Sequence, residues 1–193
     1  MTPTPASSPL PVVADGGFSG WQALNDTVMG GRSSGSCRAT NSGLILEADV
    51  VEAGGGFVSC RSPLYAPPLN LSGYSALQLD LVGDGRRFKL AVACADGLAG
   101  LTELMPGGLR WVAGFDTAAD GATQVVVPFD QLTPTVRARP ISALPLGLPL
   151  RFDAGRITRL QLLHSRFGDD GGPNPGFRAG PLHLELRSIQ ALP

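Results

Sequence analysis

Hydrophobic residues recur at every second position through much of the chain from Leu44 onward. The alternation of apolar with polar or small residues is clearest in four segments, namely 44–48, 77–81, 88–92 and 182–186. A period of two is typical of β-strands that bury one face. Further strands are predicted over 57–61, 111–115, 123–129 and 157–166. No segment keeps a helical period over ten residues, so the alternation of strands and helices found in parallel sheets is not expected.

Turn signals rich in glycine and asparagine or aspartate separate these segments. They lie at 41–43, 54–56, 84–85, 96–97, 106–108 and 120–121. Such residues supply the positive φ angles that hairpins need. We therefore expect about eight to ten short antiparallel strands in an all-β jelly-roll β-sandwich. The stretch 133–150 has four prolines and little alternation, which predicts a long crossing loop.

The beginning of the chain differs from the rest in composition. Residues 1–14, MTPTPASSPLPVVA, carry no charge and are rich in proline, serine and threonine, which predicts a flexible leader before a single β-sandwich domain over 15–193. This leader has neither the basic nor the apolar region of a secretory signal. No stretch approaches the ~18 apolar residues of a membrane helix. We therefore expect a cytoplasmic protein that does not insert into a membrane.

Charge and cysteine content exclude some classes of ligand. The net charge is -1 and the pI is about 6.1, so electrostatic binding of nucleic acid is not expected. Cys37, Cys60 and Cys94 are an odd number without a CxxC pair or nearby histidines. This pattern predicts reduced, buried thiols, with no metal site and no cofactor.

Three motifs have both a catalytic or ligand-binding and a structural interpretation. The run 31–35 matches the GxSxG elbow around Ser33, but the residues after it are strand-like rather than helical, so no enzyme is predicted. His183 and Glu185 share one strand face, which suits either an acid/base pair or a solvated face with cross-strand pairs. The loop containing residues 169–170 could hold a cation or could simply form a turn.

One segment has a combination of residue types that neither a strand nor a helix requires. Residues 21–33 combine a tryptophan, an Asn-Asp pair, a methionine and a Gly-Gly-Arg-Ser run. This segment resembles the signature of the complex I intermediate-associated protein family, the assembly factors of NADH:ubiquinone oxidoreductase and their bacterial relatives. The resemblance extends from about residue 18 to residue 189, through 55–61, 83–88, 127–129 and 174–189. One departure is Val136-Arg137-Ala138, where relatives often carry Phe-Arg-Gly after a proline-rich turn.

The resemblance implies a galactose-binding-like jelly roll that acts without catalysis. Its expected partners are protein subunits of a respiratory or photosynthetic membrane complex, so the protein could be peripheral at a membrane through its partner. The alternative is a module that binds a glycan or a small ligand, although two Trp and two Tyr offer few sugar-stacking platforms. The sequence predicts neither the client complex nor the oligomeric state.

The candidate binding surface collects residues of the signature and of three other segments. In the signature loop, Trp21 and Met29 are expected to point into the sandwich, with Asp26 and Arg32 making polar contacts that fix the turn. The resemblance places Arg61, Arg137 and Arg139 near the signature loop, where their guanidinium groups would pair with carboxylates or carbonyls of the partner. Alternatively, these arginines tie down loops through carbonyls within the protein. The candidate residues are Asn25, Asp26, Arg32, Ser33, Arg61, Arg137, Arg139 and Asn174.

Overall fold

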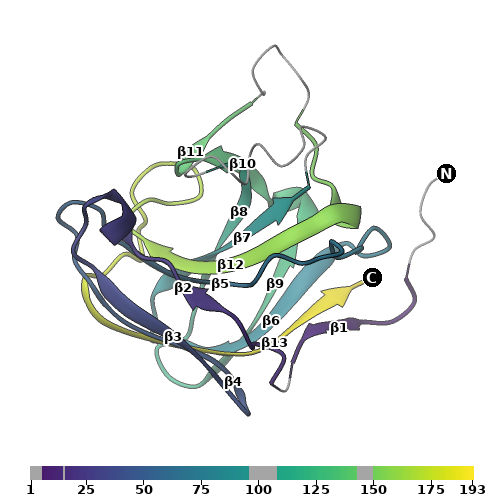
Figure 1. Ribbon diagram of the computed structural model, residues 1–193, viewed down its shortest axis with the longest axis horizontal. Coiled ribbons are helices and arrows are strands. Elements are labelled where there is room, and N and C mark those ends of the chain that lie inside the picture. Colours follow the sequence, from purple (N-terminus) through teal and green to yellow (C-terminus); the bar gives the residue numbers. More distant parts are fainter. Residues whose placement is uncertain (1–5, 15, 96–107, 143–149) are drawn as a thin grey trace.

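Two antiparallel β-sheets pack face to face in the computed structural model, which describes residues 6–14, 16–95, 108–142 and 150–193 (Figure 1). The six-stranded sheet has the order β3-β4-β13-β6-β9, and β1 also pairs with β13. Its strands are β1 (Leu10–Val13), β3 (Ser34–Thr40), β4 (Gly43–Val50), β6 (Ala76–Val82), β9 (Ala122–Pro128) and β13 (Gly180–Leu192). The predicted all-β sandwich is confirmed.

The second sheet has seven strands in the order β11-β10-β8-β7-β12-β5-β2. They are β2 (Gln22–Ala23), β5 (Phe57–Arg61), β7 (Arg87–Cys94), β8 (Arg110–Asp116), β10 (Thr133–Val136), β11 (Arg139–Pro140) and β12 (Ile157–Ser165). Three short 3-10 helices complete the described part of the chain: η1 (Asp26–Met29), η2 (Phe129–Gln131) and η4 (Ala154–Arg156).

The core lies between the sheets and follows the predicted alternation. Leu77, Leu79 and Leu81 of β6 are fully buried, as are Phe88 and Leu90 of β7. Because successive side chains of a strand point to opposite faces, each strand gives every second residue to this shared layer. Burial of such residues is the main stabilising contribution to the sandwich.

The sequence suggested that the glycine-rich turns form hairpins, but not all of them do. The turn at 41–43 does join the paired strands β3 and β4. By contrast, the turns at 54–56, 84–85 and 120–121 each carry the chain from one sheet to the other. A turn residue supplies the backbone conformation for a reversal, and it leaves open whether the next strand pairs with the last one or crosses the sandwich.

The amino-terminal boundary also differs from the prediction. Residues Leu10–Val13 lie in the expected leader, but they form β1 and pair with β13. Val13 is buried in the core. The apolar pair Val12-Val13 therefore finds a sheet partner that is distant in sequence, and the folded domain begins before residue 15.

The first part of the predicted crossing loop is a hairpin. β10 and β11 pair antiparallel, with Val136 opposite Arg139, and only the remainder of 133–150 lacks a described strand. The two turn residues between them, Arg137 and Ala138, have φ of 50° and 62°. Glycine adopts such angles readily, whereas alanine is strained there. This strained turn is where the chain departs from the Phe-Arg-Gly of its relatives.

Replacing Ala138 by glycine is therefore expected to raise the free energy of unfolding by about 1 kcal/mol, because the left-handed conformation costs an alanine about that much. Chemical denaturation of the purified variant measures the change. Ala119→Gly, at an exposed turn position where φ is not positive, is the matched control and should not stabilise. An Ala138→Gly variant less stable than the parent would contradict this description of the turn.

The cysteines overturn one prediction and confirm another. Cys37 of β3 and Cys60 of β5 form a disulfide that joins the two sheets, so the prediction that they are free thiols is wrong. Cys94 is a free thiol, as predicted, and burial raises its pKa to about 12. Pairing was missed because strands of facing sheets bring together core residues whose spacing along the chain has no characteristic pattern.

In the described part of the chain, no helix is long and apolar enough to cross a membrane.

Candidate functional site

Asp26 organises the loops at one end of the sandwich. Its side chain is fully buried. The Oδ1 atom accepts a hydrogen bond from the Ser33 N–H at 2.9 Å, and Oδ2 accepts from the Ser33 hydroxyl at 2.7 Å, from the Gly56 N–H at 2.7 Å and from the Phe57 N–H at 3.3 Å. Burial by itself raises the pKa of Asp26, but these hydrogen bonds outweigh it and hold the pKa below its usual value. One carboxylate thus joins the signature loop to the loop before β5.

Two glycines explain part of the signature. A Cβ atom at Gly55 would lie 2.5 Å from the Cβ of Asp26, and one at Gly31 would overlap the Asp26 carboxyl group. Side chains at either position would therefore displace the carboxylate from its donors. The Gly-Gly-Arg-Ser run and the triple glycine at 54–56 therefore each supply a glycine that leaves room for the Asp26 side chain.

The signature loop confirms some predictions and corrects one. Trp21 is buried and packs edge-on against Phe18, with ring centroids 5.6 Å apart. Met29, in contrast, is 65% exposed, so the prediction that it points into the sandwich is wrong. The 3-10 turn of η1 directs it outward while Asp26 takes the buried position. Arg32 is exposed and makes no polar contact with any described residue, so its predicted role in fixing the turn is also wrong.

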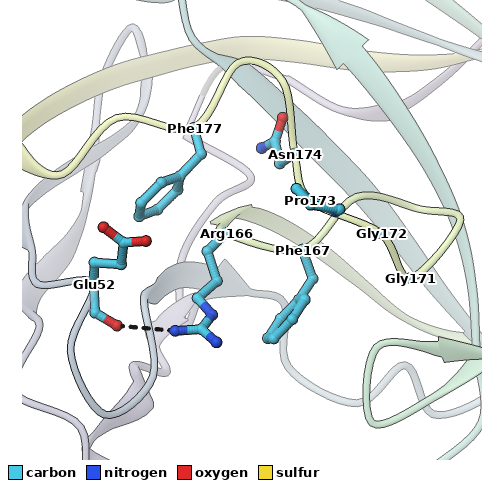
Figure 2. Close-up of a pocket in the computed structure, with 8 residues that line it drawn as sticks. All are labelled: Glu52, Arg166, Phe167, Gly171, Gly172, Pro173, Asn174 and Phe177. Carbon is cyan, nitrogen blue, oxygen red and sulfur yellow. Dashed lines mark hydrogen bonds between the residues drawn. The ribbon is translucent and has the colours of Figure 1, made fainter.

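Arg166 and Phe167 extend the same end of the molecule. The Arg166 guanidinium lies 4.7 Å from the centre of the Phe167 ring, and its Nη1 donates to the carbonyl of Glu52 at 3.4 Å. Figure 2 shows the guanidinium between that ring and the main chain at Glu52. The Arg166 N–H also donates to the Gly56 carbonyl at 2.9 Å. The loop after β12 is therefore fastened to the loop before β5.

Two shallow hollows adjoin at Arg166 and Phe167. One, of about 370 Å³, extends over Glu52 and Phe177, and the other, of about 410 Å³, extends over Met29 and the glycines at 54–55. We call this region the loop surface, defined by Met29, Glu52, Gly54, Gly55, Arg166, Phe167 and Phe177. It combines apolar side chains, the Arg166 cation, the exposed Glu52 carboxylate and the backbone of two glycines.

Buried polar groups support the loop surface from below. His164 is fully buried and stacks on Phe177, with ring centroids 5.2 Å apart, and burial lowers its pKa. The Asn174 amide donates to the carbonyls of Ser165 and Arg87 at 2.8 and 3.2 Å. Asn174 is therefore engaged within the protein.

A buried lysine fixes the neighbouring loop. The Nζ of Lys89 donates to the carbonyls of Phe167 and Gly168 at 2.6 and 3.3 Å, and burial lowers its pKa to about 8. Asp169 accepts from the Gly114 N–H, and Asp170 accepts from the Gly172 N–H, both at 2.9 Å. Asp170 thus has the turn-forming role that the sequence allowed for this loop, whereas Asp169 ties the loop to β8.

The remaining candidate residues lie in different parts of the structure. Asn25 occupies the N-cap position of η1 without a side-chain capping bond, and its Nδ2 donates to the Gly35 carbonyl at 3.1 Å. Arg61 lies on β5 next to the edge strand β2, and its buried Nε has no hydrogen-bond partner among the described residues. Arg137 and Arg139 are exposed on the β10–β11 hairpin at the opposite edge of that sheet. Five strand spacings separate β11 from β5, roughly 24 Å along the sheet. The structure thus gathers Asn25, Asp26 and Ser33, places Arg61 opposite Gln22 of the signature, and places Arg137 and Arg139 at the far edge of the sheet.

The described side chains give no arrangement for catalysis or metal binding. The Ser33 hydroxyl is buried and bonded to Asp26, and it has no histidine beside it. His183 and Glu185 are on the solvated face of β13, where His183 lies 3.7 Å from Glu47 across the strands. No group of three or more metal-ligating side chains occurs within the residues that the structure describes.

Sequence reasoning missed Arg166 and Phe167. Their signal was a bulky pair placed directly between a buried strand and the glycine-rich loop at 168–172. Such a pair has no core position to fill, because the strand has ended. The exposure of Met29 had no comparable signal, since an apolar residue beside a glycine also suits the core.

Solved structures with the same fold are carbohydrate-binding modules and parts of agarases. The family 11 module of a cellulosomal cellulase of Clostridium thermocellum has a TM-score of 0.63 and 13% identity, covering 97% of this chain and 95% of that one. The family 11 module in complex with a mixed-linked tetrasaccharide has a TM-score of 0.62 and 14% identity, covering 97% of this chain and 96% of that one. An agarase has a TM-score of 0.57 and 10% identity, covering 97% of this chain and 25% of the agarase. These identities show a shared fold alone.

Sequence families give a more specific match. No curated protein matches the chain, but the family model described as Complex I intermediate-associated protein 30 (CIA30) matches residues 13–186. The match contains the signature loop, the Asp26 hydrogen bonds and the loop surface. The chain therefore belongs to the complex I intermediate-associated protein 30 family.

Proposed function

We propose that this protein is a non-catalytic assembly factor that binds protein subunits of a respiratory or photosynthetic membrane complex through its loop surface. The observation that carries this proposal is the exposure of apolar side chains on the signature loop and on the loop after β12. Met29 is 65% exposed, the adjacent Val28 is 64% exposed and Phe167 is 38% exposed. Exposed apolar residues gathered on a rigid frame are typical of protein-binding sites.

The rigid frame makes this surface suited to binding. Asp26 and Arg166 tie three loops together through backbone groups, so little conformational entropy is lost when a partner binds. Arg166 adds a guanidinium that can pair with a carboxylate at the edge of the apolar contact. Methionine and arginine are both enriched in protein interfaces.

Glycan binding is the second candidate, and the shared fold with carbohydrate-binding modules favours it. Sugar rings stack on open aromatic faces. Both tryptophans of this chain, Trp21 and Trp111, are buried, and the Phe167 ring is already covered on one side by Arg166. The side-chain chemistry of the loop surface therefore supports a protein partner over a glycan.

The disulfide bears on the location. Disulfides persist in oxidising compartments and are rare in the reducing cytosol, so the Cys37–Cys60 bond argues against the cytoplasmic location expected from the sequence. A peripheral position at a membrane, reached through the client complex, remains part of the proposal.

A charge placed on the loop surface tests the proposal. We expect Met29→Asp to weaken the capture of complex I subunits by tagged protein about tenfold, because the variant buries a carboxylate at an apolar contact. Its melting temperature should be unchanged, since Met29 contributes little to the core. Quantitative mass spectrometry of the captured subunits and a thermal melt measure the two effects.

Leu64→Asp is the matched control, because Leu64 is 53% exposed and lies outside the loop surface. It should capture subunits as the parent does. Equal capture by Met29→Asp and the parent, or binding of a mixed-linked β-glucan oligosaccharide in place of subunits, would contradict the proposal.

A further inference from the structure

Strand β9 (Ala122–Pro128) is an edge of the six-stranded sheet and pairs only with β6. The register places Pro128 opposite Ala76, and one residue further the Phe129 N–H donates to the Ser75 carbonyl at 2.8 Å. Alternate residues of an antiparallel strand direct their N–H and C=O groups to the same side. Odd-numbered residues of β9 therefore bond to β6, and even-numbered residues direct these groups away from the sheet.

Pro128 agrees with this assignment, since proline in a strand occupies positions whose N side faces outward. The outward positions that keep an N–H are Ala122, Gln124 and Val126. No residue of the described chain pairs with these outward backbone groups. Three N–H and C=O pairs thus form an open template for another strand.

Natural edge strands are commonly protected, and within β9 only the terminal Pro128 serves this purpose. Its seven residues include no charged side chain, and Val126 is 48% exposed. At the other edge of this sheet, β3 carries Arg38 and is tied by the Cys37 disulfide. The edges of the seven-stranded sheet, β2 and β11, are only two residues long. An unprotected edge of this length is an aggregation hazard unless a partner covers it.

Acidic groups frame this open edge. Asp120 precedes β9 and Asp130 follows it; both are exposed, and neither forms an ion pair with a described residue. On the neighbouring strand, Asp80 accepts hydrogen bonds from Gln124 and Ser188 at 2.8 and 2.7 Å. The residues of β9 itself are therefore uncharged, with exposed carboxylates beyond both ends and the hydrogen-bonded Asp80 carboxylate on the strand behind its centre.

We propose that β9 is a docking edge for an extended segment of a partner protein, which adds a strand to the sheet and carries lysine or arginine on each side of an uncharged centre. Backbone hydrogen bonds would supply affinity, and the flanking charges would supply register. A second copy of this chain fits less well, because antiparallel pairing centred on Gln124 brings Asp120 of each copy beside the Asp130 end of the other. This edge shares no residue with the loop surface, so the inference goes beyond the proposed function.

Two capped, fluorescent peptides test the inference on the full chain. One has the sequence Lys-Thr-Val-Thr-Val-Thr-Lys, and the other has aspartate at both ends. By anisotropy at low salt, the lysine peptide should bind at least about tenfold more tightly than the aspartate peptide, because like charges repel at the edge. The double variant Asp120→Lys, Asp130→Lys should reverse that preference.

Backbone variants separate strand addition from charge attraction alone. Gln124→Pro removes one outward N–H and leaves the backbone bonds to β6, so it should weaken binding of the lysine peptide about tenfold. Gln124→Thr also loses the side-chain bond to Asp80 but keeps the N–H, so it should bind the peptide as the parent does. In the unmodified protein, saturating lysine peptide should slow amide hydrogen exchange at Ala122, Gln124 and Val126. Met29→Asp should leave peptide binding unchanged, which distinguishes this edge from the loop surface.

Three results would overturn the inference. These are equal binding of the two peptides, peptide binding without slowed exchange at the three outward amides, and a dimer of this chain that Gln124→Pro dissociates. The last result would identify a second copy as the occupant of the edge.

Discussion

Replacing Asp26 by asparagine is expected to lower the free energy of unfolding by about 3–5 kcal/mol. The asparagine amide has one oxygen where the carboxylate has two, and its NH₂ group would face the donors that Oδ2 now accepts from, including the Gly56 N–H at 2.7 Å. Those donors would stay buried without a partner, which is the costly outcome. Urea denaturation of the parent and the variant measures the difference. Ser33→Ala leaves Asp26 its three backbone donors but removes a hydroxyl that also accepts from the Val51 N–H at 2.9 Å, so it should cost less, about 2 kcal/mol.

Because of the Asp26 carboxylate, the free energy of unfolding should depend on pH in the acid range. Its pKa is lowered in the folded state, whereas in the unfolded chain it should be about 3.9. Its contribution to stability is therefore complete above the unfolded value, and it is lost as the pH falls through the folded pKa. The difference in the free energy of unfolding between the parent and Asp26→Asn should therefore become smaller as the pH falls from the unfolded pKa through the folded pKa. A gap that stays constant at acid pH, or an asparagine variant as stable as the parent, would contradict the role assigned to Asp26.

Removal of the disulfide is expected to cost about 3 kcal/mol. Cys37 and Cys60 are 23 residues apart in sequence, and a cross-link over a loop of that size restricts the unfolded chain by about this amount. The double variant Cys37→Ala, Cys60→Ala measures the effect under denaturant, with Cys94→Ala as a control that keeps the disulfide. Peptide mapping without reductant should find the Cys37–Cys60 linkage and one free thiol. Alkylation of all three cysteines in the native protein would contradict the structure.

The strands could be predicted because burial on one face imposes a visible period. The segment 57–61 matches β5 at both ends, and 157–166 differs from β12 by one residue. The all-β class followed from the same period, whereas the family resemblance rested on the signature at 21–33. What the pattern does not contain is the sheet to which each strand belongs. Residues 84–85 are compatible with a hairpin, yet β6 and β7 lie in different sheets.

Non-local partners account for the other errors. Cys37 meets Cys60, and the short β1 meets β13, only because the sandwich brings distant strands together. Hairpin β10–β11 was hidden because its prolines interrupt the alternation and its turn has no glycine. These features depend on tertiary packing, which a local pattern does not specify.

The site was located in part. Asn25, Asp26 and Ser33 were recognised as unusual, but their role is to hold loops together, as the buried carboxylate shows. The proposed binding role falls instead on Met29 and Phe167, which are exposed, with Arg166 beside Phe167. A sequence shows which residues are out of place in a strand, whereas exposure follows only from the packed structure.

The most direct test of the central claim is the level of assembled complex I in cells that lack this protein. Native gel electrophoresis of their membranes, with in-gel NADH oxidation, measures the assembled enzyme. We predict a loss of the mature complex with accumulation of subassemblies, restored by the parent chain and by Leu64→Asp but not by Met29→Asp. Unchanged complex I in the deletion cells, or full rescue by Met29→Asp, would contradict the account.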